Sequence, residues 1–281
     1  MIHTPPVAEF ETYERPGIAG SGTIACGLAA CASSASTVVL LARSDASAWK
    51  AEEQAHSLCA KVDGADTKRI KVTTQAADLA SCDVVVEAIV EELPPKVELL
   101  KTVGDSAGDA DLATTTSSLS LDEIASSAGH PERTFGLHPF NPVVRMDLVE
   151  LCIPETASNE IGPRARNWCE SIGKTVVEVP NEPAFVVNRL LFPYLFDAVR
   201  LMEQTGMVAE DVDRCMTLGA NYPMGPLALL DLVGIDVAVA IGEALYADSQ
   251  EEHHRPPGRL MSLVDRGQLG RKSGAGFYDY D

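Results

Sequence analysis

The feature that most constrains the fold is a series of short apolar runs that alternate with stretches of helical spacing. Thr37 to Leu41 (TVVLL) and Asp83 to Ile89 (DVVVEAI) contain few polar side chains. Strands of this kind are covered on both faces, as in a parallel sheet. Residues 47–60 between them have the pattern of a helix. This alternation predicts an α/β fold with a doubly wound sheet.

Further short strands are predicted along the first 180 residues, where apolar and β-branched residues cluster between turn residues. These strands are Leu112–Thr115, Thr134–Leu137, Leu148–Ile153 and Val176–Val179. In the serine-rich stretch between them, Ser120 followed by Glu123 is a helix-start signal.

After Val179 the pattern changes to helical spacing. Apolar residues and one amide recur at steps of three or four: Phe185, Asn188, Leu191, Leu195, Val199 and Met202. The change occurs near Pro180 to Pro183. We therefore predict an α/β domain at residues 1–181 and an all-helical domain at residues 182–281.

Composition and charge exclude several classes of protein. The net charge of −19 argues against nucleic acid or an anionic membrane as the main partner. The seven cysteines contain no C-x-x-C pair, which suits a reducing compartment, and we predict no metal site. No apolar run has membrane-spanning length, and residues 1–17 have the composition of a short polar extension rather than a signal peptide. We expect a soluble cytoplasmic protein.

A glycine turn precedes the TVVLL strand. The spacing Gly20-x-Gly22-x-x-Ala25 matches the G-x-G-x-x-G/A turn, in which small residues let the backbone approach a pyrophosphate at a helix N-terminus. The triplet is a weak signal by itself, but the next buried strand follows at the expected distance. We therefore predict a Rossmann-like dinucleotide site at these three residues.

The residues after the TVVLL strand bear on the choice of dinucleotide. An acidic residue is expected there to hold the ribose hydroxyls of NAD, but the chain has Ala42, Arg43 and Ser44. An arginine and a hydroxyl suit a 2′-phosphate, so NADP is favoured over NAD. The alternative is that Arg43 points into solvent and Asp45 replaces the missing acid.

One histidine and one glutamate form a candidate chemical pair. Arg145 to Ile153 (RMDLVELCI) is predicted as a strand on which Glu150 shares a face with apolar side chains. A desolvated carboxylate is costly unless it is paired, and His138 is the nearest titratable candidate. A histidine oriented by a carboxylate is a common general base. A structural histidine and a surface glutamate explain this segment equally well.

Six motifs resemble one known family. In order, they are VVVEAIVEE (84–92), TTSSLSL (115–121), GLHPFNPVVRMDLVELC (136–152), PAFVVNRLLFPYLFDA (183–198), NYPMGPLALLDLVGIDV (221–237) and LGRKSGAGFYDY (269–280). Together the motifs resemble the bacterial (S)-3-hydroxyacyl-CoA dehydrogenases of the 3-hydroxybutyryl-CoA dehydrogenase type. The resemblance implies an NAD(P)-dependent oxidoreductase that interconverts (S)-3-hydroxyacyl-CoA and 3-oxoacyl-CoA, with a Rossmann domain followed by a helical substrate and dimerisation domain.

The resemblance also assigns roles to single residues. It implies that His138 is the base that takes the hydroxyl proton and that Glu150 orients it. Ser117 and Asn188 match residues that contact the substrate oxygen. Residues that match cofactor contacts are Glu91, Lys96, Asn141 and Lys272. Taken singly, Ser117 could be a cap or linker residue and Asn141 could be turn chemistry.

Departures from the family leave the substrate open. Residues 43–82 are shorter than the family's CoA-binding helical segment, although Lys50 could bind CoA phosphates there; a solvated helix face explains such lysines equally well. The alternatives are an acyl-carrier-protein thioester or free hydroxy acid as substrate, or a non-catalytic nucleotide-binding protein. The apolar helical segment 184–246 and the resemblance both favour a homodimer.

Overall fold

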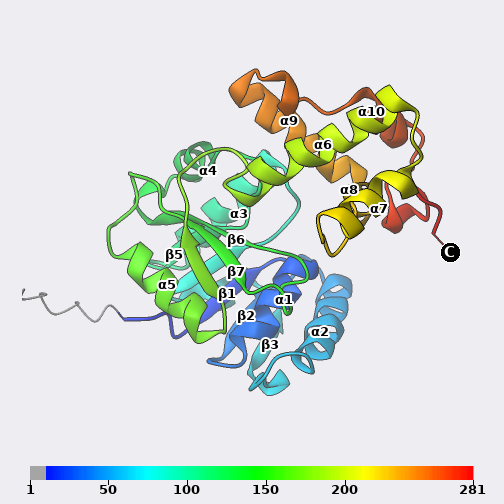
Figure 1. Ribbon diagram of the computed structural model, residues 1–281. Helices are drawn as coiled ribbons and strands as arrows, with labels where there is room; N and C mark the ends of the chain where they lie inside the picture. The colour runs from blue at the N-terminus through cyan, green and yellow to red at the C-terminus, as the bar shows by residue number, and fades with distance from the viewer. Residues whose placement is uncertain (1–10, 281) are drawn as a thin grey trace, which may run out of the picture. The chain divides into compact units, whose positions relative to one another are not determined.

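The computed structural model describes residues 11–280. The chain divides into two compact units, Met1–Asn181 and Glu182–Asp281 (Figure 1). Within residues 11–280, none of the helices combines the length and the apolar character that a membrane span requires.

Over its described residues, 11–181, the first unit is built on one eight-stranded sheet with the order β3-β2-β1-β4-β5-β6-β7-β8. The strands are β1 (Pro16–Ala19), β2 (Val38–Leu41), β3 (Ile70–Thr73), β4 (Val84–Glu87), β5 (Asp111–Thr114), β6 (Thr134–Pro139), β7 (Leu148–Cys152) and β8 (Thr175–Glu178). Only the β6–β7 pair is antiparallel within this sheet. The predicted doubly wound, Rossmann-like sheet is confirmed.

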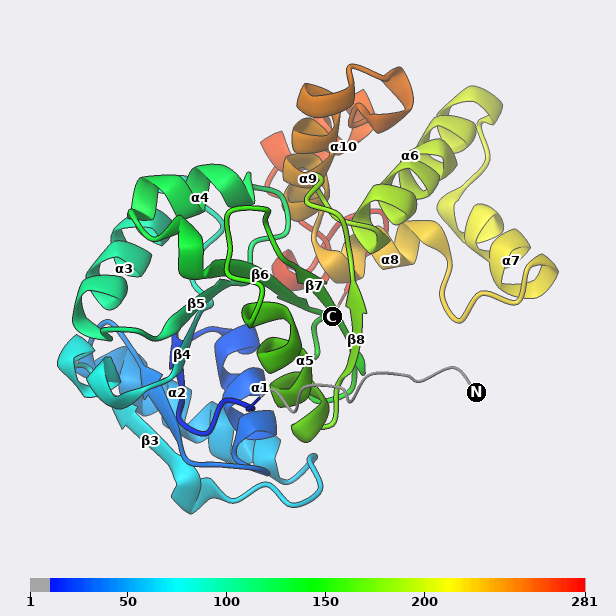
Figure 2. The ribbon, with the colours of Figure 1, turned by 90° about the vertical axis from the view of Figure 1, so that its left-hand side faces the viewer.

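Helices cover both faces of this sheet. They are α1 (Thr23–Ala32), α2 (Asp45–Cys59), α3 (Leu93–Ser106), α4 (Leu121–Ala128) and α5 (Ile161–Ser171), with the short 3-10 helices η1 (Thr67–Arg69), η2 (Ala76–Ser81) and η3 (Pro131–Arg133). Figure 2 shows α1 and α5 on one face and α3 and α4 on the other. Successive strand residues alternate between the two cores, so Val84 and Val86 pack with α1 while Val85 packs with α3.

Three details differ from the sequence-based predictions. Strands β1 and β3 were not predicted. The four residues of β1 (PGIA) overlap the end of the predicted polar extension, and the four residues of β3 (IKVT) include an exposed Lys71 and form no apolar run. Strand β7 begins at Leu148, as in the predicted strand Leu148–Ile153 and not as in the longer predicted strand from Arg145. The turn before it is held by the Lys174 ammonium, which donates to the carbonyls of Val143 and Met146. Residues 1–10 of the predicted polar extension lie outside the described residues. Within the rest of it, Tyr13 is buried and donates its hydroxyl to Asp111.

The described residues of the second unit, 182–280, are helical and have their own apolar core. The helices are α6 (Val187–Thr205), α7 (Ala209–Gly219), α8 (Pro226–Val233), α9 (Ile235–Ser249) and α10 (Gly258–Asp265), with the 3-10 helices η4 (Glu252–His254) and η5 (Arg271–Ser273). The predicted helical spacing is confirmed from Asn188 onward, where Leu195 and Val199 are fully buried in this core. Phe185 instead precedes α6, with a positive φ of 49°.

Two buried aspartates organise the second unit. Asp213 accepts hydrogen bonds from the first N–H groups of α8, at Leu227 and Ala228, and from the Tyr278 hydroxyl. Asp231 accepts the N–H groups of Phe277 and Tyr278. The motifs at 221–237 and 269–280 are therefore linked through these carboxylates.

Candidate active site

His138 and Glu150 lie side by side because of the β6–β7 register. The two residues are directly opposed on the antiparallel pair, where facing side chains are close neighbours. His138 Nδ1 lies 2.7 Å from Glu150 Oε2. A carboxylate only accepts, so Nδ1 is the donor and Nε2 is the nitrogen that can take a proton. The exposed fractions are 7% for His138 and 1% for Glu150, so water competes little for this hydrogen bond.

An aromatic side chain supports the imidazole. The Phe140 ring packs edge-on against His138, with centroids 4.7 Å apart and an interplanar angle of 64°. Phe140 belongs to the loop between β6 and β7. The imidazole is thus held through Nδ1 by a hydrogen bond and on its face by packing, which limits its rotation.

A second cluster of buried charge lies at the ends of β4 and β5. The Lys96 ammonium is fully buried and contacts Glu87 Oε1 at 2.8 Å and Glu91 Oε2 at 3.2 Å. Glu87 is also fully buried and accepts hydrogen bonds from the Thr114 hydroxyl and the Ile89 N–H. Lys96 therefore forms ion pairs with two carboxylates at once.

Glu91 holds the loop that contains Ser117. Its Oε1 accepts the Thr116 hydroxyl at 2.7 Å and the N–H groups of Ser117 and Ser118 at 2.7 and 2.9 Å. Burial by itself raises the pKa of Glu91, but Lys96 and these donors outweigh burial and lower the pKa below its ordinary value. Glu91 is thus ionised at neutral pH and positions Ser117.

A cavity of about 730 Å³ opens beside the glycine turn. It is lined by residues that follow β1, β2, β4 and β5 and by residues of α3: Ser21, Gly22, Thr23, Ile24, Arg43, Ala88, Ile89, Val90, Pro95, Glu98, Leu99, Thr102 and Thr115. The carboxyl ends of parallel strands, at the point where strand order reverses, are where dinucleotides bind in such sheets.

The glycine turn fits a pyrophosphate. A Cβ on Gly20, whose φ is +152°, would lie 2.2 Å from the Ala88 carbonyl oxygen, so the turn requires glycine there. A Cβ on Gly22 would meet nothing within 4 Å, so its backbone faces open space at the N-terminus of α1. Ala25 is fully buried against this turn. The three predicted residues therefore leave room for a phosphate beside the N–H groups of α1.

Arg43 and Ser44 have different environments. Arg43 is exposed and lines both the large cavity and a smaller one of about 110 Å³ next to it. Ser44 is the N-cap of α2, where its hydroxyl accepts the Ser47 N–H at 3.3 Å. The Ser44 hydroxyl thus has a structural function in the helix that the sequence analysis did not consider.

The other predicted site residues are distributed over both units. Asn141 is exposed in the loop after β6, and Lys50 is exposed on α2. Asn188 is buried on α6 of the second unit, with an exposed fraction of 8%. Lys272, also in the second unit, forms an ion pair with Asp236. The structure of the first unit therefore brings together His138 with Glu150, and Ser117 with Glu91 and Lys96.

The sequence analysis missed Glu87, Thr116 and Phe140. Glu87 is a single acid inside the apolar run VVVEAI, which was a usable signal, because a strand covered on both faces must pair such a carboxylate. Thr116 and Phe140 carry no such signal, since their contacts depend on loop conformation.

Comparisons with known proteins agree along nearly the whole chain. Residues 16–182 match the family model for the NAD binding domain of 3-hydroxyacyl-CoA dehydrogenase, and residues 185–280 match that for its C-terminal domain. The chain is 39% identical over 211 residues to a 3-hydroxybutyryl-CoA dehydrogenase of Mycobacterium tuberculosis, covering 74% of each. It is 41% identical over 214 residues to human mitochondrial hydroxyacyl-coenzyme A dehydrogenase, covering 75% of this chain and 68% of that protein. The crystal structure of (S)-3-hydroxybutyryl-CoA dehydrogenase PaaH1 from Ralstonia eutropha matches with a TM-score of 0.90 at 34% identity, covering 96% of this chain and 100% of that one.

Proposed function

This chain belongs to the 3-hydroxyacyl-CoA dehydrogenase family, and from that premise we propose that it interconverts a short-chain (S)-3-hydroxyacyl-CoA, such as 3-hydroxybutyryl-CoA, and the matching 3-oxoacyl-CoA. The observation that carries this proposal is the buried hydrogen bond from His138 to Glu150. An imidazole oriented by a carboxylate is a suitable general base for a hydroxyl proton.

In the proposed reaction, His138 Nε2 takes the proton of the substrate hydroxyl while the hydrogen on C3 leaves as hydride and a carbonyl forms. The bound nicotinamide supplies the acceptor for that hydride. Glu150 keeps the imidazole in the required tautomer and stabilises the imidazolium that results. Ser117 and Asn188 donate hydrogen bonds to the reacting oxygen and stabilise its developing charge.

The cofactor is proposed to be NADP rather than NAD. Gly20, Gly22 and Ala25 would lie against the pyrophosphate, and Arg43 would pair with the 2′-phosphate. In support, Arg43 lines the cavity and takes part in no ion pair with any of residues 11–280. Further cofactor contacts are proposed for Glu91, Lys96, Asn141 and Lys272, those of Lys96 acting through Glu91 because its ammonium is buried.

The carrier of the acyl group is proposed to be CoA, with Lys50 near its phosphates. The alternative is an acyl-carrier-protein thioester or a free hydroxy acid. One observation favours the alternative. The segment between β2 and β3 is shorter than the CoA-binding helical segment that the family resemblance implies. Among the described residues it contains only one α-helix, α2, which exposes Trp49 and Lys50. Rates with acetoacetyl-CoA and free acetoacetate distinguish the two.

The protein is further proposed to be a cytoplasmic homodimer that associates through its helical unit. Most large apolar side chains exposed in the described residues belong to this unit, among them Leu190 at 72% and Leu218 at 79%. A partner subunit would bury such side chains.

The first test is the initial rate of acetoacetyl-CoA reduction with NADPH and with NADH, for the native protein and His138→Gln. We expect a higher rate with NADPH and a loss of about 100-fold or more in the variant, which is the usual contribution of a general base. A higher rate with NADH would reject the NADP proposal alone. Binding of cofactor without turnover of any hydroxyacyl substrate would favour a non-catalytic nucleotide-binding protein.

A further inference from the structure

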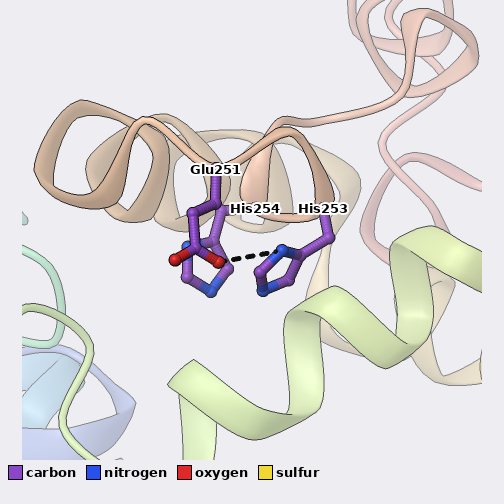
Figure 3. Close-up of side chains that lie close together, drawn as sticks. All are labelled: Glu251, His253 and His254. Carbon is purple, nitrogen blue, oxygen red and sulfur yellow. Dashed lines mark ion pairs between the residues drawn. The ribbon is translucent and has the colours of Figure 1, made fainter.

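The turn that follows α9 brings three side chains with metal-ligating atoms together. Glu251, His253 and His254 each offer one such atom, and the three atoms lie within 4.8 Å of one another. Figure 3 shows the three side chains extending to the same side of the turn, with the ion pair between Glu251 and His253 marked. The side chains of Glu251 and His253 are 60% and 50% exposed, so their rotamers can adjust to a ligand.

The spacing of the pair suits a tetrahedral ion. Glu251 Oε2 and His253 Nδ1 are 3.2 Å apart. Two ligands bound tetrahedrally to Zn²⁺ with bonds of about 2.1 Å are separated by about 3.4 Å. The first two ligands therefore need only a small movement to bind one ion.

Ser249 holds the Nδ1 side of the His254 ring. Its hydroxyl oxygen lies 2.5 Å from His254 Nδ1 and 2.9 Å from the Leu245 carbonyl oxygen, so this contact engages Nδ1 and leaves Nε2 as the ring nitrogen for a metal. A metal binds Nε2 when the ring proton is on Nδ1, where the Ser249 oxygen can accept it. His254 is 94% buried, since its exposed fraction is 6%, and Nε2 has no hydrogen-bond partner among residues 11–280.

The backbone of the turn is held before any ion binds. From α6, the Arg200 guanidinium donates to the carbonyls of Glu252, His253 and Arg255 at 3.0, 3.3 and 2.5 Å. The turn carries adjacent histidines whose ring centroids are 4.1 Å apart. Because Arg200 fixes three of its carbonyls, little backbone entropy remains to be lost on binding.

The local charges favour a cation. The cluster follows the C-terminus of the 15-residue helix α9, where the helix dipole is negative. The arginines around the turn are paired with carboxylates: Arg189 with Glu182 and Asp248, Arg200 with Asp197, and Arg255 with Glu252.

From this geometry we propose that Glu251, His253 and His254 form a binding site for a divalent transition-metal ion of the zinc type. Two imidazoles and one carboxylate are ligands for Zn²⁺ rather than for Mg²⁺ or Ca²⁺, which prefer oxygen. Water completes the coordination. The sequence analysis predicted no metal site from the spacing of the cysteines. The three proposed ligands include no cysteine, so that prediction did not take them into account. The bound ion would link the end of α9 to the chain leading into α10.

The test is calorimetric titration of Zn²⁺ into the full chain, without a histidine tag and in a Cys215→Ser background, because Cys215 is exposed and could bind Zn²⁺. We expect one ion per chain. His253→Ala and Glu251→Gln should each weaken binding by about tenfold or more, as loss of a metal-site contact does. Glu252→Gln is the matched control, since it removes the same charge from the neighbouring residue and should leave the Kd unchanged.

His254 is buried, so its replacement by alanine could affect folding. The exposed Glu251 and His253 therefore provide the decisive variants, and thermal unfolding supplies a second measurement. Zn²⁺ should raise the Tm of the native protein and leave that of a Glu251→Gln, His253→Ala double variant unchanged. Absence of saturable binding, or equal affinity in that double variant, would overturn the proposal whatever reaction the enzyme catalyses.

Discussion

At the scale of single residues, the first unit depends on carboxylates that are buried (Glu87, Glu150) or half-buried (Glu91) beside a partner. Glu150 faces His138, and Lys96 lies between Glu87 and Glu91. Each of these carboxylates would destabilise the fold without its partner. The same burial strengthens the hydrogen bonds that orient His138 and the Ser117 loop.

Replacement of Glu150 by glutamine tests the orientation of His138. The amide can donate to Nδ1 and so favours the wrong tautomer, in which Nε2 carries the proton. We expect kcat for acetoacetyl-CoA reduction to fall by about 100-fold or more, with little change in KM. Glu155→Gln, an exposed position just after β7, is the control. A kcat within a factor of two of the native value would contradict this role.

Replacement of Lys96 by methionine tests the buried ion cluster. The change leaves two carboxylates without their shared cation, and we expect a loss of about 3–5 kcal/mol in the free energy of unfolding. Urea unfolding followed by circular dichroism measures it. Lys101→Met, on an exposed part of the same helix, should change stability by less than about 0.5 kcal/mol.

Glu91 predicts a pH dependence of stability. Its pKa is lower in the folded protein than its ordinary value of 4.5. Its contribution to stability is therefore complete above that ordinary value and is lost as the pH falls through the folded-state pKa. Urea midpoints should decrease less steeply below about pH 5 in Glu91→Gln than in the native protein. The assignment would be rejected if the urea midpoint depended on pH equally steeply in Glu91→Gln and in the native protein. It would also be rejected if Glu92→Gln, at the neighbouring exposed position, reduced the steepness by the same amount.

At the scale of elements, the helical unit depends on positions where the backbone lies so close to a neighbouring side chain that there is no room for a Cβ. A Cβ on Gly276 would lie 2.0 Å from the Asp231 carboxylate that accepts the Phe277 and Tyr278 N–H groups. We expect Gly276→Ala to cost about 2 kcal/mol or more in thermal unfolding, as overpacking does. In Gly258→Ala, the new Cβ meets nothing within 4 Å, so this variant should have native stability or better.

At the scale of the whole molecule, the exposed apolar residues of the helical unit predict association. Light scattering coupled to gel filtration should give twice the chain mass of 29.9 kDa at micromolar concentration. Leu190→Asp combined with Leu218→Asp should shift the mass toward that of one chain, because a buried charge at an interface is costly. A native mass of one chain would exclude the dimer.

The sequence by itself determined the alternation of strands and helices, the Rossmann-like fold and the family, although strands β1 and β3 were not predicted. Hydrophobic period and turn residues are local properties, and the six motifs were visible in order along the chain. The glycine turn and the helix start at Ser120 were likewise predictable, because a cap and a tight turn involve neighbouring residues.

Only the tertiary structure decided which distant polar groups meet. The contact of His138 with Glu150 was open from the sequence and follows from the β6–β7 register, in which these two residues are directly opposed. The contact of Glu91 with Thr116 and Ser117 depends on the pairing of β4 with β5. The burial of Lys96 depends on how α3 packs against the sheet. Composition and spacing carry no information on such contacts, because register and packing arise from the assembled core.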